Sequence, residues 1–341
     1  MKLFAHFVKG LGKVTVALIV AVLLLSLFFC FYYIRPIHID NSKGGTDYVW
    51  PPRSHWVTLT EGISFGSYDE QGFNNLSVVQ NPDILVLGSS HMEGTNIFPF
   101  EAAPYLLGDL LKGKYSVYNK GISGHDFYKI CQYLPANIEL YENKPKVVIL
   151  ESSRVDVFQK NLDEIVSGNV KYTQSHNSGI IGTLQKVPFF RLLYMQVKGG
   201  LLNLFVHQKT NDEKPLLSDD SIDENPYRML CEYFRSIEKK YGTQIIIAYH
   251  TTGQIERDGT IYFEPSERKD LFKKIANDSG ITFLDLTDDF KKMYETEHHV
   301  AHGFVTGKLG SGHLNKYGHA AMAKALYRTI IDMEKEGEIC K

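Results

Sequence analysis

The sequence has few cysteines, and neither they nor the histidines form a metal-binding motif. Only four cysteines occur in 341 residues, far apart at Cys30, Cys131, Cys231 and Cys340. None forms a CxxC pair or the spacing of a zinc site, and the 13 histidines include no HExxH motif. We therefore expect no metal, no cofactor and at most one disulfide, with free thiols as the simpler alternative.

The chain also lacks an excess of charge of either sign. Its formal net charge is −2, and 43% of its residues are hydrophobic, which is an ordinary globular composition. Without a basic excess, nucleic acid is not an expected partner. No internal repeat or low-complexity tract is present. The length allows one large domain or two small ones.

One long apolar run stands near the N-terminus, at Val14–Ile34. It is long enough to span a membrane, too long for the core of a signal peptide, and not followed by a small-residue cleavage site. Lys2, Lys9 and Lys13 precede it, which favours a cytoplasmic tail over residues 1–13. The rest of the chain is then expected outside the cytoplasmic membrane, tethered by one helix. The alternative is a buried core helix.

The remaining chain is expected to form one domain over residues 81–341, after a linker and domain edge of irregular structure at 35–80. Residues 155–225 are polar and break the pattern of the domain, so we expect a partly helical insertion that could cap a site. Elsewhere short apolar runs alternate with helical segments. The expected strands are 84–87, 115–119, 146–151, 244–249 and 281–286. The expected helices are 100–112, 126–143, 226–241, 265–279, 287–297 and 315–335.

This alternation predicts an α/β fold: a flavodoxin-like parallel sheet of about five strands with helices on both faces. In such sheets, ligands bind beyond the carboxyl ends of the strands. The first strand ends within Asp83–Gly94, which reads DILVLGSSHMEG. Ser89, Ser90 and His91 therefore sit where chemistry is expected. The alternative is that they form only a polar turn before a helix.

A serine becomes a nucleophile only when a base removes its proton, so Ser90 needs an imidazole within hydrogen-bond reach. His313 is the best candidate, because it lies in a glycine-rich turn ahead of the last helix, for which Asn315 is an expected N-cap. The backbone amides of Ser90 and Gly121, at the ends of neighbouring strands, could stabilise an oxyanion.

Three stretches resemble the sequence blocks of the SGNH (GDSL-like) hydrolase superfamily. The family's strand followed by G-D-S is similar to Leu87–Ser90 (LGSS), and its glycine block is similar to Asn119–Gly124 (NKGISG). Its last block, D-x-x-H-L-N-x-x-G, is similar to Gly310–Gly318 (GSGHLNKYG). The resemblance covers about residues 83–325, apart from the insertion.

The resemblance implies that Ser90 is the nucleophile, His313 the base and Gly121 an oxyanion residue. Two departures stand out. Gly310 occupies the position of the family's aspartate, and the asparagine of its third block is missing. Ser90 and His313 therefore act as a dyad, or the orienting acid comes from elsewhere, with a backbone carbonyl as a further possibility.

Two acids at strand ends, Glu151 and Asp285, are the candidates for that orienting role. Glu151 is equally well explained as a buried structural carboxylate. Arg154, near the missing asparagine, could stabilise the oxyanion or bind an anionic substrate, or it could form a salt bridge at the base of the insertion. His91 and Ser89 could contact substrate, although an exposed neighbour without a role is the simpler reading of His91.

The membrane segment, together with the G-S-S form of the first block, is similar to one subgroup of this superfamily. It comprises bacterial surface-polymer acyl-transfer proteins, including those of teichoic acid D-alanylation and exopolysaccharide O-acetylation. The resemblance implies a membrane-bound O-acyltransferase partner, a cell-envelope polymer as acceptor, and O-acyl transfer, with acetyl as the expected group. An esterase with the same Ser-His site and a non-catalytic polymer-binding or scaffold protein remain alternatives.

Overall fold

The structure is a computed structural model that describes residues 2–32, 36–59, 61–153, 159–167, 224–265 and 267–339, with isolated positions between 183 and 193. The chain divides into two compact units, which we describe separately. One unit contains helix α1 (Lys2–Tyr32), and the other contains the β-sheets and the helices α2 to α5 and α8 to α11.

Helix α1 contains a stretch, Val8–Phe28, with a mean hydropathy of 2.5, of which 6% is buried. It is long enough and apolar enough to cross a membrane, although a signal sequence would have the same properties. The helix overlaps the apolar run expected at 14–34 and begins earlier in the chain.

The second unit is built on a five-stranded sheet in which every pair of neighbouring strands is parallel. The strand order is β11-β8-β7-β5-β6, the flavodoxin-like order, which confirms the fold class expected from the sequence. The strands are β5 (Ile84–Leu87), β6 (Val117–Asn119), β7 (Val147–Ser152), β8 (Gln244–Tyr249) and β11 (Thr282–Asp285).

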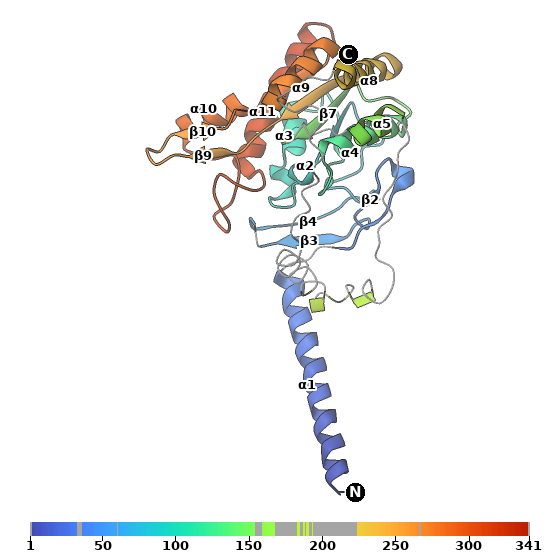
Figure 1. Cartoon of the computed structure of the whole chain (residues 1–341), viewed down its shortest axis with the longest axis vertical. Coiled ribbons are helices and arrows are strands. Elements are labelled where there is room, and N and C mark those ends of the chain that lie inside the picture. Colours follow the sequence, from blue (N-terminus) through green and yellow to red (C-terminus); the bar gives the residue numbers. More distant parts are fainter. Residues whose placement is uncertain are drawn as a thin grey trace. The chain divides into compact units, whose positions relative to one another are not determined.

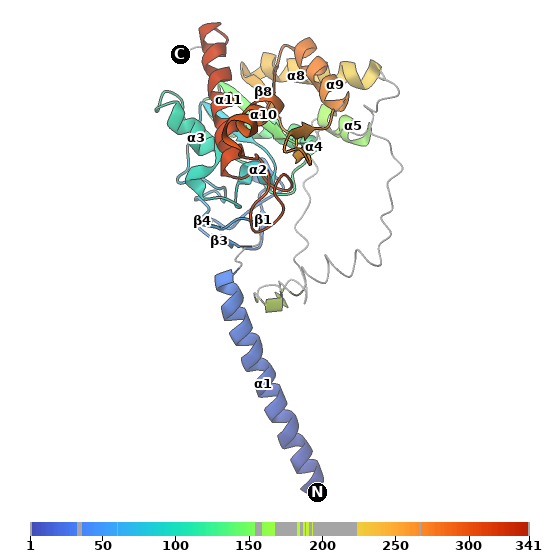
Figure 2. The same cartoon turned by 90° about the vertical axis from the view of Figure 1, so that its left-hand side faces the viewer.

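Helices cover both faces of this sheet (Figures 1 and 2). Successive side chains of a strand point to opposite faces, so Ile84 and Val86 belong to one core cluster and Leu85 and Leu87 to the other. The first cluster is completed by α3 (Ala103–Leu110), α10 (Thr287–Glu297) and α11 (Lys316–Lys335). The second is completed by α4 (Phe127–Glu139), α5 (Gln159–Ser167), α8 (Glu224–Tyr241) and α9 (Glu267–Ser279).

Three antiparallel hairpins stand beside the main sheet, and the sequence did not predict them. They are β1 (Ile39–Asp40) with β2 (Tyr48–Val49), β3 (His55–Thr58) with β4 (Ser64–Ser67), and β9 (Gly253–Ile255) with β10 (Ile261–Phe263). Residues 35–80 were expected to be irregular, yet Trp50, Trp56 and Tyr68 are buried there in a cluster of their own. This segment from His38 onward therefore belongs to the folded unit.

Part of the expected insertion at 155–225 also belongs to the domain. Helix α5 lies against α4 and α8 and buries Leu162 and Ile165 in the second core cluster. Apart from α5, the start of α8 and a few isolated positions, the insertion lies outside the described residues. Cys131 and Cys231 are both buried free thiols.

Candidate active site

Ser90 lies at the carboxyl end of β5, where the chain turns from the strand into the short helix α2 (Ser90–Glu93). Ser89 caps this helix, and its hydroxyl accepts a hydrogen bond from the His91 amide. A Cβ atom at Gly88 would lie 2.5 Å from Met92 Cγ and 2.7 Å from Glu151 Oε2. Glycine at position 88 therefore allows the turn to pack closely against both side chains.

The imidazole of His313 faces Ser90, with 2.9 Å between His313 Nε2 and Ser90 Oγ. His313 ends the loop that precedes α11, and its carbonyl accepts a hydrogen bond from the Gly303 amide across that loop. Asn315 caps α11 by accepting from the amides of Tyr317 and Gly318, as the sequence predicted. The expected meeting of Ser90 and His313 is thus confirmed by their distance.

A carboxylate orients the imidazole from the other side, and it belongs to Glu61. Glu61 Oε2 lies 2.8 Å from His313 Nδ1, and Glu61 Oε1 accepts a hydrogen bond of 2.8 Å from the His313 amide. The hydrogen bond from the His313 side chain is the largest influence on Glu61 and holds the pKa of its carboxyl below the usual value. Ser90, His313 and Glu61 therefore form a continuous chain of hydrogen bonds.

Glycine at 312 makes room for this carboxylate. Gly312 has φ +89°, and a Cβ atom there would lie 2.2 Å from Glu61 Oε1. Glu61 follows β3 in the loop of the β3–β4 hairpin, a segment for which the sequence analysis expected only irregular structure. The one local signal is the pair Glu61-Gly62, whose glycine has φ +85° and turns the hairpin.

Both acids that the sequence proposed as orienting groups lie elsewhere, and this prediction was wrong. Glu151 is fully buried and accepts hydrogen bonds from the Ser89 amide and hydroxyl, and His250 Nε2 lies 2.8 Å from it. Asp285 pairs with Lys269 and accepts from the amide and hydroxyl of Thr287 at the start of α10. Neither carboxylate contacts His313.

The two predicted oxyanion donors differ in availability. The Gly121 amide donates to Asn119 Oδ1 at 2.9 Å, so it is already used. A Cβ atom at Gly121 would lie 2.6 Å from the Glu93 amide nitrogen, so this glycine serves close packing against α2. The Ser90 amide has no acceptor among the described residues and remains the candidate donor. Arg154 lies outside the described residues.

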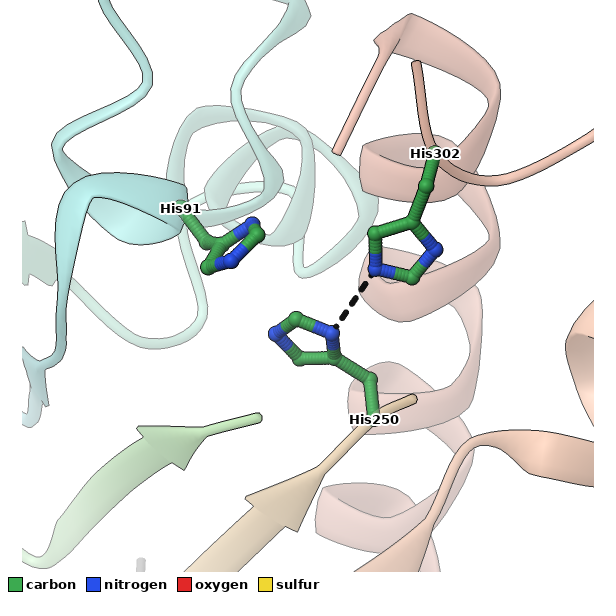
Figure 3. A group of neighbouring side chains, drawn as sticks. All are labelled: His91, His250 and His302. Atoms are coloured by element: carbon green, nitrogen blue, oxygen red, sulfur yellow. Dashed lines mark hydrogen bonds between the residues drawn. The ribbon is translucent and has the colours of Figure 1, made fainter. Parts of the chain in front are cut away.

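Three further histidines lie close together, one of them next to Ser90 in the sequence (Figure 3). His91 belongs to α2, His250 directly follows β8, and His302 lies in the loop between α10 and α11 that also contains His313. One ring nitrogen of each lies within 4.8 Å of the others, a spacing that a metal ion could bridge. No sequence motif predicts this group, because its members are far apart along the chain.

Hydrogen bonds and burial determine the protonation state of these three rings. His250 Nδ1 lies 3.0 Å from His302 Nε2, as the dashed line in Figure 3 marks. His91 Nδ1 accepts a hydrogen bond of 3.1 Å from the Leu314 amide. Burial lowers the pKa of His250 to about 3 and the pKa of His91 and of His302 well below the usual value. All three rings are therefore neutral at physiological pH.

No protein-family model and no curated protein sequence matches this chain. Among solved structures, it is similar to a lipolytic protein of the G-D-S-L family from Desulfitobacterium hafniense, with 12% identity and a TM-score of 0.33, over 72% of this chain and 97% of that one. A catalytic mutant of an acetylxylan esterase from Geobacillus stearothermophilus shares 15% identity with a TM-score of 0.38, over 74% and 95%. An acetyl xylan esterase named AlAXEase shares 15% identity with a TM-score of 0.36, over 72% and 99%.

Proposed function

We propose that this domain is a serine-dependent enzyme that breaks an acyl ester and holds the acyl group on Ser90. The observation that carries the proposal is the unbroken chain from Ser90 Oγ to His313 Nε2 and from His313 Nδ1 to Glu61 Oε2. A nucleophile, a base and an orienting carboxylate in this order are the parts that acyl transfer through a serine requires. Ser90, the first member of this series of hydrogen bonds, lies at the carboxyl edge of the parallel sheet, where ligands bind in this fold.

The proposed reaction begins when His313 Nε2 takes the hydroxyl proton of Ser90, and Ser90 Oγ attacks the acyl carbonyl. The Ser90 amide donates to the oxyanion that forms, and Glu61 stabilises the charged imidazole and keeps Nδ1 protonated. His313 then gives its proton to the leaving alcohol as the ester bond breaks. A second hydroxyl, activated by the same imidazole, attacks the acyl-serine and restores Ser90.

Membership of the SGNH superfamily is part of the proposal, and it rests on the three sequence blocks. The geometry supports it at Ser90 and His313, which the blocks nominate and which lie 2.9 Å apart. In this chain Glu61, from a hairpin upstream of the nucleophile, takes the place of the family's aspartate, which Gly310 replaces. The alternative of a non-catalytic scaffold rested mainly on the absence of that aspartate. Glu61 supplies a carboxylate in its place and so weakens that argument.

We further propose that α1 anchors the enzyme in the cytoplasmic membrane with its N-terminus inside and the catalytic domain outside. The apolar stretch of α1 supports the anchor, and Lys2, Lys9 and Lys13, which all precede Val14, support the orientation. The proposed reaction is O-acyl transfer, with acetyl as the group, to a hydroxyl of a cell-envelope polysaccharide or teichoic-type polymer. A membrane-bound O-acyltransferase is the proposed partner that supplies the acyl group.

The test incubates the purified full-length protein in detergent with an acetyl ester donor, with and without an oligosaccharide acceptor. We expect acetyl groups on the acceptor, and loss of the product with Ser90→Ala. Free acetate alone, released in a Ser90-dependent way, would replace the transferase with an esterase. Equal donor turnover by the native chain and Ser90→Ala would overturn the enzyme proposal in favour of a scaffold.

A further inference from the structure

Glu151 is a fully buried carboxylate that the proposed reaction does not use. It stands near the end of β7, and three hydrogen-bond partners surround it: the Ser89 amide at 2.8 Å, the Ser89 hydroxyl at 2.9 Å and His250 Nε2 at 2.8 Å. A buried charge is costly unless such donors satisfy it. Glu151, a buried carboxylate that needs several donors, is thus bonded to Ser89, the residue that precedes the nucleophile.

These contacts fix the direction of every hydrogen bond in the group. A carboxylate only accepts, so His250 must carry its proton on Nε2. A neutral imidazole has one N–H, which leaves His250 Nδ1 as an acceptor. His302 Nε2, 3.0 Å away, must therefore be the donor to it. The result is one chain of donors from His302 through His250 to Glu151, with a single allowed set of tautomers.

The two ends of this chain attach to the two halves of the candidate site. One end holds the amide and the hydroxyl of Ser89, next to the nucleophile. The other end is His302, which pairs with Leu314 in a β-bridge across the loop that contains His313. A second tie runs in parallel, because the Leu314 amide donates to His91 Nδ1 on helix α2.

The same bonds argue against a metal ion at the three histidines. His91 accepts from Leu314 through Nδ1, so its proton is on Nε2 and neither nitrogen offers a free lone pair. Ligating histidines in metal sites donate through their second nitrogen instead of accepting there. The hydrogen bonds of the three rings run to other protein groups: Leu314, Glu151 and one another.

We propose that Glu151 is a positioning residue, and that the chain from Glu151 through His250 to His302 ties the nucleophile turn to the loop of His313. The tie keeps Ser90 Oγ within reach of His313 Nε2, because it restrains both segments at once. This inference rests on the proposed serine chemistry and deepens it. It assigns a role to a buried network whose members are distributed over three segments of the sequence.

The direction of the hydrogen bonds from His302 through His250 to Glu151 can be tested with variants that reverse it. In Glu151→Gln the Ser89 amide, which only donates, requires the new amide oxygen, so the amide nitrogen faces His250 Nε2. Two donors then meet there, unless His250 changes tautomer and meets the donor of His302 instead. His302→Gln alone can keep the original direction, because its amide nitrogen donates to His250 Nδ1. In the double variant the amide at 302 can turn its oxygen to His250, which accommodates the reversed chain.

We expect Glu151→Gln to lower kcat for ester cleavage by roughly 10- to 100-fold with little change in KM, since displacements of about 1 Å have effects of this size. His302→Gln should stay within about threefold of the native chain, as expected where the hydrogen bond is kept. The double variant should recover much of the kcat that Glu151→Gln loses. The measurements use the full-length chain in detergent, with thermal unfolding recorded for each variant.

His319→Asn is the matched control, because His319 is also buried and its Nδ1 accepts a hydrogen bond from the Ala103 amide, while no hydrogen bond joins it to Ser89 or His302 among the described residues. It should lower the unfolding temperature without changing kcat.

Unchanged kcat in Glu151→Gln, or a double variant no better than that single variant, would overturn the inference. Stoichiometric metal in the purified native chain, lost in His302→Gln, would also overturn it. A native chain without Ser90-dependent turnover would refute the proposed function instead. In that case, nitrogen NMR of labelled histidines still tests whether His250 and His302 both carry Nε2–H.

Discussion

At the scale of single residues, the site depends on a carboxylate that reaches His313 from far upstream in the chain. Glu61 binds both the ring and the backbone amide of His313, so it fixes the position of the imidazole as well as its tautomer. Gly312 leaves the space that this carboxylate occupies. Two substitutions separate these contributions.

Glu61→Gln should lower kcat for ester cleavage by roughly 10³- to 10⁴-fold, the size of effect seen when an orienting carboxylate becomes an amide in a serine triad. The amide nitrogen would face His313 Nδ1 and favour the tautomer that cannot accept the serine proton. Steady-state kinetics on an acetyl ester measures this. Glu70→Gln is the control, because Glu70 is an exposed carboxylate paired with Arg53 at the surface. Equal activity of the two variants would contradict the role of Glu61.

Gly312→Ala should reduce activity about as much as Glu61→Gln does, because the added methyl would lie 2.2 Å from Glu61 Oε1 and displace the carboxylate. The positive φ adds a backbone cost of about 1–2 kcal/mol. Gly113→Ala is a matched control, since Gly113 has φ +74° with open space around it. It should lose a similar amount of stability in urea unfolding and keep full activity. If both glycine variants stay active, Glu61 does not need this space.

Ser90 and His313 could be predicted from the sequence because each lies in a short local pattern: a buried strand ending in Gly-Ser-Ser, and a glycine-rich turn before a capped helix. Glu61 could not be predicted, because no motif in the neighbouring sequence indicates a carboxylate that contacts His313. Its place is set by the β3–β4 hairpin and by the glycine at 312, which are features of the folded chain. Glu151 was nominated for its position at a strand end, and there it serves Ser89 instead.

At the scale of elements, the main sheet was predictable and the small hairpins were not. Strand β8 has the bounds that the apolar run Gln244–Tyr249 predicted, because a strand buried on both faces appears as a continuous hydrophobic run. The hairpin strands are two to four residues long, and several are half-exposed, so they carry no such run. One of these hairpins nevertheless supplies Glu61.

The first residues of helix α11 connect the loop that contains His313 to the core. The contribution of the helix cap, Asn315, to stability is therefore worth measuring. Asn315 accepts from the amides of Tyr317 and Gly318 and donates to the carbonyls of Val300 and Gly303. Asn315→Ala should lower the free energy of unfolding by about 1–3 kcal/mol, from the lost cap and the carbonyls left without donors. Urea unfolding followed by circular dichroism measures this change.

Asn315→Asp is the informative comparison for the same position. It keeps an acceptor for the helix amides and loses the donors to the loop, so its stability should fall between that of the native chain and Asn315→Ala. A loss equal to that of Asn315→Ala would mean that the helix cap contributes nothing.

At the scale of the whole molecule, the unit that contains the sheet holds several histidines in a neutral state. Burial lowers the pKa of His250 and of His319 to about 3, and the pKa of His91 and of His302 also falls well below the usual value. The unfolded chain would bind protons at these positions from about pH 6.5 downward. Stability therefore rises with pH in this range.

We expect the stability that these groups contribute to be fully present above about pH 6.5 and to fall as the pH drops toward 3, by about 1.4 kcal/mol per pH unit for each histidine. Urea unfolding at pH 7, 6 and 5 tests this dependence. His319→Asn removes one titrating group and should flatten the curve by about one proton. An equally steep curve for that variant would show that other groups cause the acid sensitivity.

The order in which the three site residues occur along the chain has a consequence for biosynthesis. The carboxylate comes first, at Glu61, the proposed nucleophile follows at Ser90, and the proposed base comes only at His313, just before the last helix. While the polypeptide is still being made, the serine therefore has no partner to remove its proton. Under the proposed mechanism, a nascent or prematurely terminated chain that ends before residue 313 would lack the base that Ser90 needs to attack an ester.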